Sequence, residues 1–239
     1  EELNRQITAR IADYHFAPTL KSQENLLKEN ISSENILITG NTVIDALYYA
    51  VKKVNSINNN TIESLKNIIN FKKDIVLVTG HRRENHGKGF INICKALKKV
   101  AEQNSVQIIY PVHMNPNVQK PVNEILKNVN NVLLIDPLPY EAFLWLMEKS
   151  KLIITDSGGI QEEAPSLGKP VLVLRETTER PEAVDAGTVI LVGTSTERII
   201  QEANNLLQND SEYERMSKLH NPYGDGKSSK RILNFLLKK

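Results

Sequence analysis

The residues best suited to chemistry lie between Ile153 and Ala164, where an apolar strand passes through Asp156-Ser157-Gly158-Gly159 directly into a helix. Glycine lets the backbone approach a ligand closely and adopt dihedral angles closed to other residues. Unpaired N–H groups and the positive end of the helix dipole favour an anion at such a helix start, and Ser157 can add a hydroxyl group. The run therefore predicts a phosphate-binding turn.

Two acids follow the glycines. We expect Glu162 and Glu163 in the first turn of this helix, where one carboxylate could bind a ribose. A purely structural interpretation also accounts for the run: Asp156 or Ser157 caps the helix, the acids complement its dipole, and the glycines only permit tight strand-to-helix packing. A short glycine motif does not decide between the two interpretations.

The elements that must position this turn alternate from Lys73 onward, strand then helix. The expected strands are continuous apolar runs, namely 75–78, 106–110, 132–135, 152–154, 171–174 and 189–192. Strands of this kind, separated by helices, are typical of a parallel sheet that is covered on both faces. The sequence therefore predicts a doubly wound α/β domain.

Ligands of such sheets bind beyond the carboxyl ends of the strands, so the loops that follow the strands are the candidate site. Five of these loops carry polar residues, namely 80–85, 111–116, 136–140, the Ser157 turn and 175–182. They hold two histidines and four arginines, which suits a diphosphate. His81 and His113 directly follow strands, and we expect at least one to contact the ligand.

Within the loop 175–182, the arginines could simply pair with the neighbouring acids as a solvated network. Arg180 is the better candidate for an anion contact, because it directly precedes Pro181 and an expected helix start.

The part of the chain before Lys73 is expected to be helical for the most part. Leu3, Ile7 and Ile11 recur at steps of four, so the chain begins within a helical pattern and, starting with Glu, looks like a fragment. The further expected elements are a helix through Leu20 and Leu27, a strand at 36–39, a helix capped by Thr42, an Asn-rich linker at 55–60 and a helix at 62–71.

Composition excludes several classes of protein. The 239 residues are 40% apolar with a net charge of +2, which supports a sizeable core and gives no basic stripe for nucleic acid. No run of about 20 apolar residues or signal peptide is present, so we expect no membrane role and a cytoplasmic location. Cys94 falls on an apolar helical face and is expected to be a buried thiol. Metal-ligand spacing, a Gly-x-Ser-x-Gly elbow and a Gly-x-Gly-x-x-Gly fingerprint are all absent from the sequence.

Seven motifs together resemble one family across essentially the whole chain: HFAPT, NLLKEN, ITGNTVIDAL, TGHRREN, YPVHMNPNV, TDSGGIQEEAPSLGKPVLVLRETTERPEAVDAGT and HNPYGDG. In this order they closely resemble the bacterial non-hydrolysing UDP-N-acetylglucosamine 2-epimerases. The resemblance implies an α/β fold of the glycosyltransferase-B type, with the active site between two Rossmann-like halves. It implies the tail of the first domain at 1–39, a connecting segment at 40–72 and the UDP-binding domain at 73–239, whose last helix, near 228–237, crosses back towards the first domain.

The resemblance also implies a reaction. Members interconvert UDP-N-acetylglucosamine and UDP-N-acetylmannosamine by eliminating UDP to leave a 2-acetamidoglucal, then adding UDP back with protonation from the other face. No cofactor is implied; the implied partners are UDP-N-acetylglucosamine, UDP and, at full length, a second copy in a homodimer.

Site residues are carried over by position. Ser157, Gly158 and Gly159 match phosphate-binding positions, Glu163 the ribose-binding carboxylate, Arg180 a ligand contact and Phe143 the wall of the uracil pocket. His81 and Glu1 match active-site residues, and Arg82 and His113 match positions that bind a second UDP-N-acetylglucosamine as activator. Leu138 stands where some relatives have a polar residue near the base.

The family's further active-site acids and basic phosphate contacts precede the position of Glu1. We therefore expect the parent protein to be an epimerase and this polypeptide alone to be inactive. Three alternatives stay open: a hydrolysing 2-epimerase, a glycosyltransferase of the same architecture, and a nucleotide-sugar-binding module without catalysis.

Overall fold

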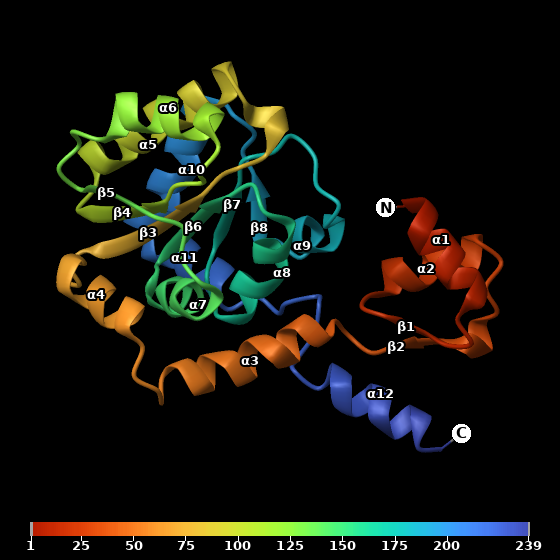
Figure 1. The fold of residues 1–239 in the computed structure, drawn as a ribbon. Coiled ribbons are helices and arrows are strands. Elements are labelled where there is room, and N and C mark those ends of the chain that lie inside the picture. Colours follow the sequence, from red (N-terminus) through yellow and green to blue (C-terminus); the bar gives the residue numbers. More distant parts are fainter. Residues whose placement is uncertain (1, 239) are drawn as a thin grey trace. The chain divides into compact units, whose positions relative to one another are not determined.

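The computed structural model describes residues 2–238, and the chain forms two compact units (Figure 1). Unit 1 combines Glu1–Tyr48 with Pro222–Lys239, and unit 2 is Tyr49–Asn221. These boundaries differ from the predicted ones at 39/40 and 72/73. Residues 49–72 of the predicted connecting segment group with unit 2, and residues 222–239 of the predicted UDP-binding domain group with the N-terminal segment.

Unit 2 is built on a six-stranded sheet in which every strand pair is parallel. Its strands are β3 (Asp74–Thr79), β4 (Val106–Pro111), β5 (Val132–Ile135), β6 (Leu152–Thr155), β7 (Val171–Val173) and β8 (Val189–Leu191). All six predicted strands are confirmed, with ends shifted by at most one residue. The continuous apolar runs are strands because both of their faces are buried.

The order of the strands across the sheet is β5-β4-β3-β6-β7-β8. The chain therefore builds outward from β3 in one direction, then returns and builds outward from β6 in the other. In doubly wound sheets the crevice where ligands bind lies at such a reversal, outside the carboxyl ends of the two strands, which here are β3 and β6. The loop after β3 and the Ser157 turn after β6 border this crevice.

Helices cover both faces of the sheet. Alternate residues such as Val76 and Val78 join one core cluster with α5 (Lys88–Gln103), α6 (Pro116–Leu126) and α10 (Thr196–Gln208). Leu77, between these two valines, and Ile153 of β6 point to the opposite face and are also fully buried. That face is covered by α7 (Tyr140–Lys149) and α8 (Gly158–Ser166) (Figure 1). Cys94 lies within the first cluster, so the expected buried thiol is confirmed. The remaining helices of this unit are α4 (Asn60–Ile68), α9 (Pro181–Asp185) and α11 (Asp210–Ser217).

Two predicted helix starts are wrong, and asparagine explains both. Helix α3 (Thr42–Val54) begins at Thr42 itself, and the Asn41 Oδ1 atom accepts the Val43 amide at 3.0 Å. Helix α4 begins two residues earlier than predicted, because Asn59 accepts two amides of its first turn, and it ends three residues earlier, at Ile68. The Asn-rich linker thus supplies a cap, a role that asparagine fills well.

Unit 1 contains a short parallel sheet and four helices. Its elements are α1 (Glu2–Ile11), β1 (His15–Ala17), α2 (Leu20–Lys28), β2 (Ile36–Ile38), the start of α3, and α12 (Ser228–Leu236). Strands β1 and β2 pair in parallel. Phe235 of α12 makes edge-to-face contacts with Tyr14 and Phe16, at 5.1 and 5.8 Å between ring centroids. Within residues 2–238, no helix combines the length and hydropathy that crossing a lipid bilayer requires.

Candidate functional site

Asp156 joins the two loops that border the crevice. Its side chain is fully buried, and its Oδ2 atom accepts hydrogen bonds from the backbone amides of His81 and Arg82, both at 2.8 Å. Just below, the hydroxyl groups of Thr79 and Thr155 lie 2.6 Å apart across β3 and β6. The possibility that Asp156 caps α8 is therefore wrong: its carboxylate fixes the loop after β3 to the turn after β6.

Helix α8 begins at Gly158, directly after Ser157. Ser157 occupies the N-cap position but makes no capping hydrogen bond through its side chain, so its hydroxyl group is left for a ligand. Neither Gly158 nor Gly159 has a positive φ. The prediction that these glycines adopt dihedral angles closed to other residues is therefore wrong. The contribution of Gly158 is space: the nearest atoms to an added Cβ would be the Nη2 atoms of Arg82 and Arg180, each at 3.9 Å.

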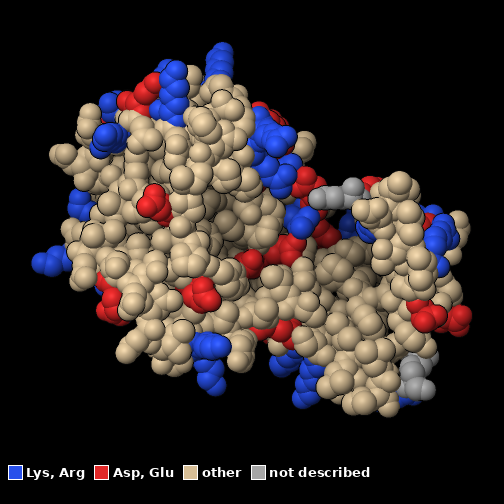
Figure 2. All heavy atoms as spheres, in the orientation of Figure 1, with Lys and Arg blue, Asp and Glu red and all other residues tan. Residues whose placement is uncertain are grey.

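Two guanidinium groups thus converge on the N-terminus of α8. Arg180 is held through its Nε atom by the buried carboxylate of Glu162. The buried Nε atom of Arg82 has no hydrogen-bond partner, and no residue within 2–238 forms an ion pair with this side chain. A helix N-terminus flanked by one fixed and one unpaired guanidinium is an anion site with capacity for more than one negative charge. Figure 2 shows basic and acidic side chains together on this side of unit 2.

The two neighbouring acids of α8 have separate roles. They lie beyond the first turn of the helix, so the expected first-turn position is wrong. Glu162 pairs with Arg180, whereas Glu163 is partly buried and accepts a hydrogen bond from the Tyr140 hydroxyl at 3.2 Å. Burial, and secondarily the charge of Glu162, raises the pKa of the Glu163 carboxyl, which the Tyr140 bond partly offsets. Burial also raises the pKa of Tyr140 to about 12.

Sequence reasoning included Tyr140 in a candidate loop without giving it a role. It is the first residue of α7, and Phe143 follows three positions later, on the same side of that helix. Phe143 is partly buried, as is Leu138 in the preceding loop. The candidate ribose and uracil residues therefore come from two adjacent elements, α7 and α8.

The two histidines that follow strands are brought together. The rings of His81 and His113 stack with 5.7 Å between centroids and 23° between planes. His81 also places its Nδ1 atom 3.3 Å from Asp156 Oδ1. The structure therefore gathers every candidate residue of the loops after β3, β4 and β6 at the crevice edge, while Glu1 lies outside the described residues.

Arg175 belongs to a structural network. It donates through Nε to Glu84 at 2.7 Å and through both Nη atoms to Glu179 at 2.6 and 2.9 Å, with only 7% of its side chain exposed. The hydrogen bonds from Arg175 lower the pKa of Glu179 to about 2. Arg175 is thus engaged by Glu84 and Glu179, whereas the guanidinium group of Arg180 reaches the N-terminus of α8.

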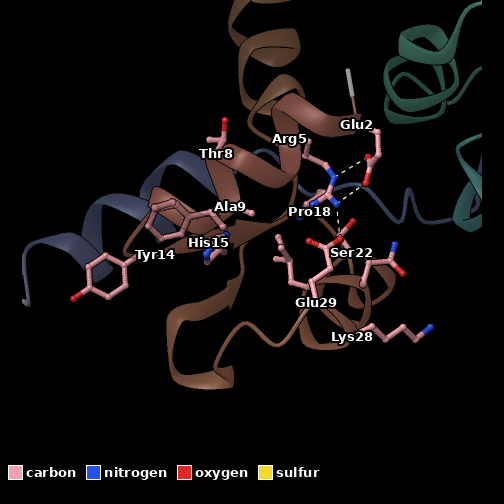
Figure 3. Close-up of a pocket in the computed structure, with 15 residues that line it drawn as sticks. Glu2, Arg5, Thr8, Ala9, Tyr14, His15, Pro18, Ser22, Lys28 and Glu29 are labelled. Carbon is pink, nitrogen blue, oxygen red and sulfur yellow. Dashed lines mark hydrogen bonds and ion pairs between the residues drawn. The ribbon is translucent and has the colours of Figure 1, made fainter.

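Unit 1 has a hollow of its own, of about 850 Å³, formed by α1, β1 and α2 (Figure 3). Arg5 lies at its rim and pairs with Glu2 at 2.7 Å and with Glu29. Arg5 is therefore already paired with two carboxylates. None of the described candidate site residues lines this hollow, and we assign no ligand to it. Among residues 2–238, no group of three His, Cys, Asp or Glu side chains is placed to hold a metal ion.

A doubly wound parallel sheet with a candidate anion site at its switch point is typical of nucleotide-binding α/β domains. A family model described as UDP-N-acetylglucosamine 2-epimerase matches residues 1–237. The UDP-N-acetylglucosamine 2-epimerase of Campylobacter jejuni is 57% identical over 244 residues, covering 100% of this chain and 64% of that protein. This chain therefore belongs to the UDP-N-acetylglucosamine 2-epimerase family.

Solved structures agree with this assignment. The crystal structure of the Neisseria meningitidis UDP-GlcNAc 2-epimerase bound to UDP-GlcNAc matches with a TM-score of 0.91 and 48% identity, covering 100% of this chain and 65% of that one. The Methanocaldococcus jannaschii enzyme in complex with UDP-GlcNAc and UDP matches with a TM-score of 0.79 and 36% identity, with the same coverage. The fold is thus of the glycosyltransferase-B type, and the chain spans about 64% of the length of its curated relatives.

Proposed function

We propose that this chain binds UDP at the crevice between β3 and β6 of unit 2. The observation that carries the proposal is the pair of guanidinium groups, Arg82 and Arg180, that meet at the open N-terminus of α8. In this proposal the diphosphate lies against Ser157, Gly158 and Gly159, within reach of both arginines. The ribose binds Glu163 and the uracil packs on Phe143.

We further propose that the protein interconverts UDP-N-acetylglucosamine and its C2 epimer. The C2 proton of the sugar is weakly acidic, so the bond from C1 to the diphosphate breaks as that proton leaves, giving a C1–C2 double bond and free UDP. Re-addition of UDP at C1, with a proton delivered to the other face of C2, gives the epimer. The arginines and the helix N-terminus stabilise the charge on the departing diphosphate, and His81 lies beside it as a proton carrier.

The non-hydrolysing type is supported by the loops GHRREN and YPVHMNPNV, which are the segments that carry His81, Arg82 and His113. We propose that Arg82 and His113 also contact a second, activating UDP-N-acetylglucosamine, that Glu1 is an active-site acid, and that the protein at the length of its relatives is a homodimer. Unit 2 is then the UDP-binding domain.

The first test is calorimetric titration of the chain with UDP and, in parallel, with uridine, which lacks the diphosphate. We expect UDP to bind at least about a hundredfold more tightly, because charge-assisted bonds to two arginines and a helix N-terminus are lost with uridine. Equal affinities, or no binding of UDP to the folded chain, would contradict the site. NMR of products formed from UDP-N-acetylglucosamine separates the reactions: a UDP-linked epimer supports epimerisation, and free N-acetylmannosamine identifies the hydrolysing type.

Glu163 gives a pH-dependent prediction. We expect Glu163→Gln to weaken UDP binding by roughly tenfold at pH 7, because a charged acceptor for the ribose hydroxyl groups is replaced by a neutral one. As pH falls through the raised pKa of this carboxyl, the wild type takes up a proton and loses the same acceptor. The two affinities should therefore converge on acidification, starting above the ordinary titration range of glutamate.

Titrations of wild type and Glu163→Gln from pH 7.5 to 4.5 measure this convergence, and the protonation of UDP itself cancels in the ratio. Tyr140→Phe serves as the matched variant, since it removes the hydrogen bond to Glu163 while keeping the carboxyl group. An affinity ratio that stays constant across this pH range would count against a ribose contact by Glu163.

A further inference from the structure

We infer that Asp156 is a positioning residue that fixes the tautomer of His81 and the course of the backbone at Arg82. This inference rests on the proposed function for its purpose, but its geometry is independent of any ligand. The side chain of Asp156 is 0% exposed, its Oδ2 atom accepts the amides of two consecutive residues of another loop, and its Oδ1 atom, which makes no hydrogen bond, lies 3.3 Å from the ring of His81. A carboxylate that costs so much to bury needs such partners.

The two oxygens of Asp156 perform different tasks. Oδ2 accepts the amides of His81 and Arg82 at 2.8 Å each, and the amide group of buried Asn85 lies 3.5 Å from the same atom. Asn85 is itself anchored, because it donates to the Leu174 carbonyl at 3.0 Å. Oδ2 therefore holds the start of the loop, and with it the Arg82 side chain, at a fixed place over the N-terminus of α8.

Oδ1 is buried without a hydrogen-bond partner, and Nδ1 of His81 lies 3.3 Å from it. A buried carboxylate oxygen that lacks a donor favours the tautomer that directs an N–H group at it, so we expect Nδ1 to carry the proton. In the neutral ring the acceptor is then Nε2, to which no residue within 2–238 donates a hydrogen bond. With 47% of the His81 side chain exposed and its ring stacked on His113, Nε2 is the one ring atom left to exchange a proton with a ligand.

The test is Asp156→Asn, which preserves size. Its carbonyl oxygen can still accept the amides of His81 and Arg82, but its NH₂ group then faces Nδ1 and requires that atom to accept. We expect the neutral ring of His81 to carry its proton on Nδ1 in the wild type and on Nε2 in the variant. Side-chain ¹⁵N NMR of the chain, with the signals of its five histidines assigned through His81→Gln, reads the tautomer directly.

Asp74→Asn is the matched control, because Asp74 starts β3 at the other end of the sheet and pairs with Lys151 on the surface. We expect it to leave the His81 tautomer unchanged. The same tautomer in the wild type and in Asp156→Asn would overturn the inference. If the variant does not fold, the wild type decides: a proton on Nε2, or fast hydrogen exchange at the His81 and Arg82 amides, overturns it as well.

UDP titration separates this inference from the proposed function. We expect Asp156→Asn to bind UDP within about threefold of the wild type, since the backbone anchor persists. A tautomer switch in a chain that does not bind UDP leaves the positioning role intact and removes the proposed nucleotide site. Binding of UDP without a tautomer switch supports the proposed nucleotide site and overturns the positioning role.

Discussion

Replacing Arg180 by alanine is expected to weaken UDP binding by roughly a hundredfold or more. The guanidinium is oriented by the buried carboxylate of Glu162, so it needs little reorganisation to meet a diphosphate. Truncating one partner of a buried, hydrogen-bonded charge pair costs about 2–5 kcal/mol, which is roughly 30- to 4,000-fold in affinity. Calorimetric titration with UDP, beside the wild type, measures the loss.

The design must separate a lost contact from a damaged fold, because Arg180→Ala leaves Glu162 buried without its ion pair. The double variant Arg180→Ala with Glu162→Gln removes both charges, and we expect it to bind UDP as weakly as the single variant. Arg198→Ala removes an exposed arginine from α10 and should keep wild-type affinity. If the double variant regains tight binding, Arg180 does not contact the diphosphate.

Replacing Ile154 by alanine is expected to destabilise unit 2 by about 2–5 kcal/mol, a large part of the roughly 5–15 kcal/mol that stabilises a typical domain. Ile154 is fully buried in β6, where it lies beside Val78 of β3 and Leu172 of β7. Its side chain joins the cluster formed with α5 and α10, so the deletion leaves a cavity that close-packed neighbours cannot fill.

Urea unfolding followed by the fluorescence of Trp145 measures this loss in the right unit. Trp145 is the only tryptophan of the chain and is buried in α7 of unit 2. Ile154→Val is the matched control, with an expected cost of about 0.5–1.5 kcal/mol. In the folded fraction, UDP affinity should stay at the wild-type value, since Ile154 does not reach the crevice edge. A midpoint unchanged in both variants would contradict the central position of β6.

The sheet of unit 2 could be predicted from the sequence because local pattern and tertiary environment agree there. Runs such as residues 75–78 have no polar face, and only a strand covered on both sides buries such a run within four residues. Helix ends were harder to predict. At Asn41 and Asn59, the side-chain oxygen accepts amides of the first turn and so sets where the helix starts. The spacing of apolar residues along the sequence does not indicate such a hydrogen bond.

Much of the candidate site was also predictable, because its residue types are informative. The glycine turn, the two histidines after strands and Arg180 before a proline all lie at the crevice edge. Tyr140 was missed because a tyrosine at the start of a helix has many structural uses. Only its 3.2 Å hydrogen bond to Glu163 distinguishes this one.

By itself, then, the sequence determined the strands, the parallel sheet and the loops at the sheet edge where we propose that the ligand binds, because apolar runs and strand-following loops are local properties. The tertiary structure alone decided how neighbouring residues divide their roles. Glu162 and Glu163 are adjacent carboxylates, yet the helix turns about 100° between them, so one meets Arg180 and the other Tyr140. Capping of its own helix was one of the interpretations open for Asp156, but its partners lie 74 and 75 residues away. Such partners are chosen by the packing of the strands, which brings distant loops together, and no local pattern encodes them.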